Sequence, residues 1–256
     1  MAFKKDSVVG TMVFIISLSL VCSFMITGTA EILKERKLVK KRDEVQQFVL
    51  KAAGIESNSG DFRELFASRV QPKLVDLESG QFIEQENILD FDGRMAAINP
   101  ETSRKPKKDI AKIKSRADQV RIFEVFDDQG QLSSIVMPIY GKGLWSMIYG
   151  YLAVEPDLNT IKNIVFYEHG ETPGIADFVT DPQWNALWQG KKLFDEKGKI
   201  AIKVVKGGAK AGDIHGVDGV SGATRTGVGI QKAVEFWFGV EGYQNFLHTF
   251  AKTEVK

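Results

Sequence analysis

The residues best suited to chemistry in this chain lie in one short loop that precedes its last two helical stretches. The loop reads Asp218-Gly219-Val220-Ser221-Gly222-Ala223-Thr224-Arg225-Thr226. Gly222 and Ala223 remove side-chain bulk, so the backbone and the neighbouring hydroxyls can approach a phosphate group closely. An amphipathic stretch follows, and the N–H groups at the start of a helix favour negative charge. The residues alone leave two interpretations open, a phosphate site or an ordinary turn with a helix N-cap.

The same loop resembles the Asp-Gly-x-Ser-Gly-Ala-Thr motif of covalent flavin-binding proteins. In that family the last threonine of the motif carries FMN through a phosphoester, which implies that Thr224 is the attachment residue here. Two upstream segments strengthen the resemblance, Gly141-Lys142-Gly143-Leu144-Trp145-Ser146 and Glu168-His169-Gly170-Glu171-Thr172-Pro173-Gly174. In this order the three segments resemble the FMN-binding domain of membrane redox complexes, from Phe123 to Ala251.

The rest of the chain resembles the C-subunit family of sodium-translocating NADH:quinone reductases, because a single apolar span and a helical insert precede the flavin-type loops. Leu144-Trp145-Ser146 and Trp188-Gln189-Gly190-Lys191-Lys192 also look like that family. Two segments depart from the pattern. Ile175-Ala176-Asp177 replaces a sequence that usually contains glycine, and Arg225 stands where an apolar residue is common. The first departure bears on the flexibility of the loop and not on the flavin.

The resemblance implies a set of residues that contact the cofactor. An isoalloxazine ring needs a flat apolar surface and a few hydrogen-bond partners, whereas the phosphate end needs donors or positive charge. The residues implied at the phosphate end are Asp218, Ser221, Gly222, Ala223, Thr224, Thr226 and Lys206. Those implied at the ring are Leu144, Trp145, Glu171 and Thr172. No catalytic residue is expected, because a separate flavin transferase would attach FMN from FAD to the chain.

An uncharged stretch from Val8 to Ala30 predicts a single transmembrane helix, since roughly 20 apolar residues cross a bilayer. The alternative of a cleaved signal peptide fits less well, because its apolar region is usually about 7–15 residues long. A lipid anchor at Cys22 is disfavoured, because Val21 stands where a small residue is needed.

Composition excludes several classes of function. The net charge of +1 gives no basis for nucleic-acid binding. Cys22 is the only cysteine and lies inside the apolar stretch, which excludes a disulfide, a thiolate metal cluster and iron–sulfur chemistry within the chain. The three histidines are scattered, so no metal site is expected.

Helical patterns dominate the first part of the chain after the span. Residues 31–53 predict a helix that ends at Gly54, and residues 61–70 predict a second helix with Asp61 as its N-cap. The polar and basic stretch 87–116 reads as a surface loop, with a solvated face favoured over contact with anionic lipids.

The second half alternates between strand and helix patterns. Residues 120–126 and 133–140 predict one hairpin, and residues 148–154 and 161–167 predict another, which favours an antiparallel sheet. A short helix near 183–188, a strand at 200–205 and helices at 227–238 and 241–252 follow. Ala233, Phe236 and Trp237 are expected to pack on the sheet, because such stripes are usually core.

We therefore expect an α+β protein in which a single N-terminal transmembrane helix precedes a mixed, largely antiparallel sheet with packed helices. The predicted divisions are a transmembrane anchor at 1–30, a juxtamembrane helical region and insert at 31–118, and an FMN-binding domain at 119–256. The resemblance implies a flavoprotein subunit with covalent FMN that passes electrons inside a sodium-translocating NADH:quinone oxidoreductase. Its partners would be the other subunits, the membrane and the flavin transferase.

Two alternatives remain, the equivalent flavin subunit of the related ferredoxin-linked membrane oxidoreductase and a membrane-anchored scaffold without redox function. The resemblance implies a single-pass protein of the bacterial inner membrane with its flavin domain in the periplasm, where the transferase of the family acts. Charge argues against this orientation, because Lys4 and Lys5 precede the span whereas six basic residues follow it between Lys34 and Arg42.

Overall fold

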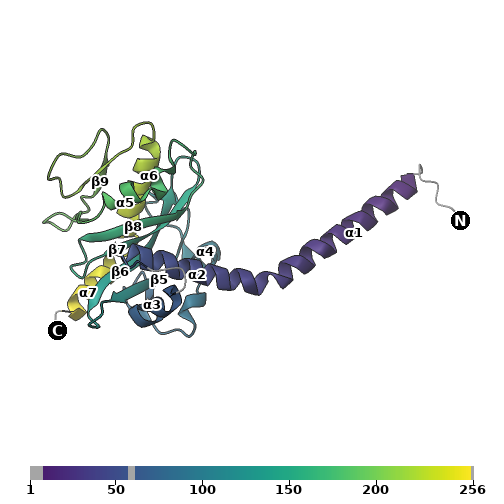
Figure 1. Ribbon diagram of the computed structural model, residues 1–256, viewed down its shortest axis with the longest axis horizontal. Coiled ribbons are helices and arrows are strands. Elements are labelled where there is room, and N and C mark those ends of the chain that lie inside the picture. Colours follow the sequence, from purple (N-terminus) through teal and green to yellow (C-terminus); the bar gives the residue numbers. More distant parts are fainter. Residues whose placement is uncertain (1–7, 57–60, 255–256) are drawn as a thin grey trace. The chain divides into compact units, whose positions relative to one another are not determined.

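The computed structural model describes residues 8–56 and 61–254 (Figure 1). Contacts divide the chain into two compact units, with the boundary between Val45 and Gln46. Lys4 and Lys5, which enter the charge argument on orientation, lie outside the described residues.

The first unit is helical. Helix α1 (Val8–Ile32) is long and apolar enough to cross a membrane, a property it shares with signal sequences near an N-terminus. Helix α2 (Lys34–Ala52) begins in this unit after a turn at Leu33. The predicted stop at Gly54 is confirmed, because Gly54 has φ +74° and its N–H donates to the Lys51 carbonyl at 3.1 Å.

A six-stranded antiparallel sheet forms the centre of the second unit (Figure 1). Its strand order is β2-β1-β5-β6-β7-β8, with bounds Phe82–Ile83, Val70–Asp76, Gln119–Phe126, Leu132–Lys142, Met147–Val154 and Ile161–Glu168. A parallel pair, β9 (Lys203–Val205) and β10 (Gly216–Asp218), lies outside this sheet. The predicted α+β class and both predicted hairpins are confirmed, and the expected strand at 200–205 is shorter than predicted.

Helices cover both faces of the sheet. On one face, α6 (Thr224–Trp237) and α7 (Gln244–Glu254) share a hydrophobic core with inward side chains of β5 to β8, such as Met137 and Leu152. On the other face, the end of α2 and α3 (Phe62–Arg69) contact the sheet through Phe48, which stacks on Tyr167, and Phe66, which meets the edge of Phe123. Both faces of the sheet are therefore buried.

Aromatic side chains at the end of α6 and in the connection to α7 complete the hydrogen bonding of β6. Pro138 has no N–H, and β5 no longer pairs with β6 beyond Val136. The Tyr243 hydroxyl donates to the Pro138 carbonyl at 2.5 Å, and Trp237 Nε1 donates to the Tyr140 carbonyl at 2.8 Å. The predicted packing of Trp237 on the sheet is confirmed, and it anchors the helix that starts at Thr224.

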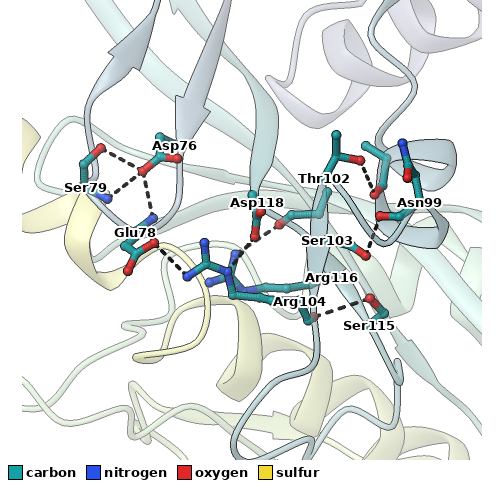
Figure 2. A network of polar contacts seen from close by, with 12 residues as sticks. Asp76, Glu78, Ser79, Asn99, Thr102, Ser103, Arg104, Ser115, Arg116 and Asp118 are labelled. Carbon is teal, nitrogen blue, oxygen red and sulfur yellow. Dashed lines mark hydrogen bonds and ion pairs between the residues drawn. The ribbon is translucent and has the colours of Figure 1, made fainter.

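The basic stretch after residue 87 is more ordered than the predicted surface loop. It contains a 3-10 turn (Ile88–Asp90), helix α4 (Gly93–Ile98), and strands β3 (Ser103–Arg104) and β4 (Arg116–Ala117). Figure 2 shows that Arg104 contacts Glu78, in the turn after β1, at 2.9 Å and Asp118, which directly precedes β5, at 2.5 Å. Side-chain hydrogen bonds inside the stretch, such as Ser103 Oγ to the Asn99 carbonyl at 2.7 Å, replace the missing regular pairing.

Three local expectations differ from the structure. Asp61 stands at the N-cap position of α3, but its side chain makes no capping hydrogen bond. Val70 begins β1 and does not end a helix. Because β1 and β2 belong to the central sheet, residues 46–56 and 61–118 pack in the same compact unit as residues 119–254. The short helix expected near 183–188 is α5 (Pro182–Ala186), which follows a 3-10 turn at Asp177–Thr180.

Candidate functional site

The small-residue loop leads directly into helix α6. Strand β10 ends at Asp218, and Gly219 N–H donates to the Val205 carbonyl at 2.9 Å. Gly222 has φ +86°, a left-handed conformation that favours glycine. Ala223 occupies the N-cap position and has no side chain that can cap the helix. The first N–H groups of a 14-residue helix are thus left for another acceptor, which is the arrangement that binds anions.

Exposure alternates along this loop. Ser221, Gly222, Thr224 and Arg225 are exposed, whereas Ala223 and Thr226 are buried. Thr224 is the first residue of α6, so its hydroxyl lies beside the free N–H groups. The structure brings together at one exposed helix end the glycine, the hydroxyl and the donors that the sequence pointed to.

Glu171 connects this helix end to the turn formed by residues 143–146. The Thr226 hydroxyl donates to Glu171 Oε2 at 2.6 Å. The backbone N–H of Leu144 donates to the same oxygen at 3.1 Å, and those of Trp145 and Ser146 donate to Oε1 at 3.0 and 3.1 Å. Three segments that are distant in sequence therefore meet at one buried carboxylate, which is 4% exposed.

These contacts keep Glu171 ionised. Burial by itself would raise the pKa of its carboxyl, but the hydrogen bonds from the Thr226 hydroxyl and from the N–H groups of residues 144–146 outweigh burial and hold the pKa below its usual value. Donors of this kind stabilise the charged form more than the neutral form.

Two glycines allow the turn and the helix to approach each other. A Cβ on Gly143 would lie 2.7 Å from Glu171 Oε1 and 2.7 Å from Ile148 Cδ1. A Cβ on Gly229, in the next turn of α6, would lie 2.5 Å from the Lys142 carbonyl oxygen. A side chain at Gly229 would push residues 142–143 away from α6, and a side chain at Gly143 would displace the Glu171 carboxylate.

Apolar side chains near the helix start face outward. Trp145 is 65% exposed and Leu144 is 37% exposed, although their backbone N–H groups point inward to Glu171. Val228 is 39% exposed and lies four residues after Thr224, on the same side of α6. Ile175 is 55% exposed in the loop that follows Glu171. Exposed apolar side chains are what a planar ring requires.

The remaining predicted contacts lie around this centre in different ways. Thr172 is exposed, and its carbonyl accepts the Ala176 N–H at 2.9 Å. Asp218 contacts neighbouring protein groups. Its Oδ1 accepts the Ala209 N–H at 2.6 Å, and its backbone carbonyl accepts the Trp184 Nε1–H at 2.8 Å. Lys206 is exposed and follows Val205, the β9 partner of Asp218.

The sequence reasoning missed several residues that shape the site. Ser146 Oγ accepts the Gly170 N–H at 2.6 Å and so joins the two upstream loops. The roles of Gly229 and Val228 were hidden in a helix that looked like core. The only sequence signal for them was their spacing after Thr224, at positions four and five along the helix.

Among the described residues, no group of three or more metal-ligating side chains is suited to hold a metal ion. The site combines an uncapped helix start with exposed apolar side chains of the 143–146 turn.

The second unit matches a known family of cofactor-binding domains. The FMN-binding domain family matches residues 143–239, a stretch that contains the turn, Glu171 and the start of α6.

Individual relatives make the assignment narrower. The C subunit of the Na(+)-translocating NADH-quinone reductase of Haemophilus ducreyi is 40% identical, with 98% of this chain and 97% of the relative covered. The corresponding protein of Vibrio parahaemolyticus is 44% identical, with 96% and 97% covered. The crystal structure of Shewanella oneidensis NqrC is 64% identical, has a TM-score of 0.82, and covers 84% of this chain and 99% of that one. This chain belongs to the NqrC family, the C subunits of the Na(+)-translocating NADH-quinone reductases, as the sequence resemblance implied.

Proposed function

We propose that this chain carries FMN covalently on Thr224 and passes electrons through it as the NqrC subunit of a sodium-translocating NADH:quinone reductase. The observation that supports the attachment most strongly is the start of α6. There an exposed threonine hydroxyl lies at an uncapped helix N-terminus, after a left-handed Gly222.

The residues around Thr224 fit FMN. The first N–H groups of α6 would hold the phosphate, while exposed Leu144 and Trp145 would lie against the ring. FMN supplies one- and two-electron transfer when bound. The protein supplies a fixed apolar surface, an anion site and the exclusion of water from one face of the ring.

Attachment requires chemistry that this chain does not supply. A threonine hydroxyl is a poor nucleophile at neutral pH, so a flavin transferase would provide a base and a magnesium ion. The Thr224 oxygen forms the phosphoester bond as the pyrophosphate bond of FAD breaks. AMP leaves, and the hydroxyl proton goes to the base of the transferase. In this reaction the chain is the acceptor.

Helix α1 would anchor the protein in the bacterial inner membrane, with the flavin domain in the periplasm. The length and composition of α1 support the anchor. The orientation follows from the place where the transferase of the family acts, although the basic residues after the span favour the other side. A reporter that fluoresces only in the cytoplasm should stay dark when fused after Lys256, and a fluorescent fusion would refute the orientation.

Thr224→Val tests the attachment, because valine keeps nearly the same volume but has no hydroxyl. When the chain is coexpressed with the transferase, the wild type should fluoresce in a denaturing gel, and Thr224→Val should be dark and lighter by one FMN adduct. Thr102→Val is the matched control, since it removes an exposed threonine hydroxyl outside the residues assigned to the site and should keep the flavin. Fluorescence that persists in Thr224→Val would refute Thr224 as the attachment residue.

A further inference from the structure

We propose that Glu171 is a positioning residue of this site and not a contact of the flavin ring. Its buried carboxylate holds the 143–146 turn against the first turn of α6, and so it fixes where Leu144 and Trp145 lie relative to Thr224. This inference rests on the proposed function, because it assigns a role to Glu171 within that same site.

Both carboxylate oxygens of Glu171 already accept hydrogen bonds from the protein. An ionised carboxylate has two oxygens that accept hydrogen bonds and no donor. Oε1 already accepts from Trp145 N and Ser146 N, and Oε2 accepts from Leu144 N and the Thr226 hydroxyl. At 4% exposure, the side chain is directed into the protein and its oxygens are engaged there.

The donors to Glu171 belong to two different parts of the site. Thr226 lies two residues after Thr224 in the first turn of α6, which is a rigid element of 14 residues. The three N–H donors all belong to the turn whose apolar side chains face outward. One carboxylate therefore connects the attachment end of the site to its apolar surface.

Steric contacts also constrain this part of the site. The Glu171 carboxylate lies so close to Gly143 that a Cβ there would be 2.7 Å from Oε1, and α6 approaches the Lys142 carbonyl through Gly229. The closeness of the turn to the helix thus depends on the absence of a side chain at Gly229, and the closeness of the turn to its acceptor depends on the absence of one at Gly143. Loss of the acceptor should let the turn move, because three N–H groups would then seek water.

Amide hydrogen exchange on the full chain in detergent, without flavin, tests the tether directly. In Glu171→Gln, the amides of residues 144–146 should exchange at least about tenfold faster than in the wild type, since an amide NH₂ replaces one acceptor oxygen. Thr226→Val, which removes only the hydroxyl, should show a smaller increase at the same amides. Thr226→Ser keeps the hydroxyl and should behave as the wild type.

A destabilised control separates positioning from general loss of stability. Val154 is fully buried in β7 and pairs with Ile135 of β6. Val154→Ala should lower the global stability but leave exchange at residues 144–146 unchanged relative to other surface turns. Thr226→Val serves as the test if Glu171→Gln fails to fold.

The flavin-loaded chain provides the second measurement. Glu171→Gln should retain flavin on Thr224, but iodide should quench the emission of that flavin more strongly than in the wild type, because the 143–146 turn no longer holds its side chains over the ring. Unchanged exchange at residues 144–146 in both Glu171→Gln and Thr226→Val would overturn the positioning role. If the wild type carried no flavin on Thr224, the proposed function would fail, whereas the exchange result would still decide whether Glu171 tethers the turn.

Discussion

Glu171 and Asp157 are two acidic side chains of the same sheet unit, and both accept several hydrogen bonds from the protein. Asp157 closes the β7–β8 connection, where it accepts the N–H groups of Asn159 and Thr160 at 3.0 and 2.7 Å and the Lys192 ammonium at 3.0 Å. Glu171 instead accepts donors from segments 25 to 55 residues away.

The difference between the two carboxylates concerns their backbone donors, which lie two and three residues from Asp157 but 25 to 27 residues from Glu171. The acceptor of a local turn forms with the turn itself, and its side chain is 44% exposed. Glu171 can accept its donors only when the sheet and α6 are in place, and its side chain is buried. We infer that the conformation of the β7–β8 turn depends mainly on residues within the turn, whereas the geometry of the flavin site depends on the assembled fold.

Truncation of the two carboxylates should give the largest contrast. Glu171→Ala leaves three backbone donors and the buried Thr226 hydroxyl without their acceptor, and should lower the free energy of unfolding by about 3 kcal/mol. Asp157→Ala exposes its donors to water and should cost only about 1 kcal/mol. Urea unfolding of the full chain in detergent, followed by tryptophan fluorescence, measures both. Equal losses would break the comparison.

Alanine at the two close-contact glycines should have the next largest effect. Gly143→Ala should cost about 2 kcal/mol, because its Cβ meets both the carboxylate and Ile148. Gly229→Ala gains helix propensity of about 1 kcal/mol, but its Cβ meets a backbone oxygen that cannot move freely, so we expect a net loss. Gly130 has φ +76° but no neighbour within 4 Å of a Cβ, so Gly130→Ala isolates the cost of backbone strain. A stable Gly143→Ala protein with unchanged exchange at the turn would argue against tight apposition.

The stability contributions of the two carboxylates should be lost at different pH values as the solution is acidified. Both have a lowered pKa in the folded protein, so each stabilises the fold above its ordinary pKa and loses that contribution as the pH falls through its folded pKa. For Glu171 the stability difference between wild type and Glu171→Gln should begin to shrink below pH 4.5. Burial alone would raise the pKa of Asp157, but hydrogen bonds from Thr160, Asn159 and Lys192 lower it to about 2, so the difference between wild type and Asp157→Asn should persist to pH 3.8 and vanish near pH 2. Urea midpoints between pH 2 and 6 measure these differences, and a Glu171 contribution that does not depend on pH would contradict its ionised state.

Trp145→Ala should have the smallest effect on stability, because the side chain is 65% exposed. We expect a change within about 0.5 kcal/mol in urea unfolding. Covalent flavin should remain, but its emission should change, because an aromatic face commonly quenches a flavin and alters its redox properties. Identical flavin spectra in the variant and the wild type would remove Trp145 from the ring surface.

The sequence predicted the local features of the fold well. The Asp157 turn was visible because Pro156, Asp157 and Asn159 interrupt two β-branched runs, and the structure confirms the hairpin. Strand β1 was missed because Pro72 stands in its middle, and proline in a strand pattern argues against a strand. It is tolerated there because β2 pairs with β1 only at Leu74 and Val75, so Pro72 lies on an open edge.

The site could be predicted only in part. The loop around Thr224 is continuous in sequence, so its glycine and hydroxyl could be recognised directly. Glu171 was also singled out, but its donors come from residues 144–146 and 226, and no periodicity links those positions. Which way its side chain faces follows only from the packing of α6 on β6.

A crystal structure of the flavin-loaded chain tests the central claim most directly, namely that the protein itself assembles this site around Glu171. We predict that the FMN phosphorus is bonded to Thr224 Oγ1 and that Glu171 still accepts from residues 144–146 and from the Thr226 hydroxyl. A Glu171 side chain turned toward the ring, with those donors bonded elsewhere, would contradict the account.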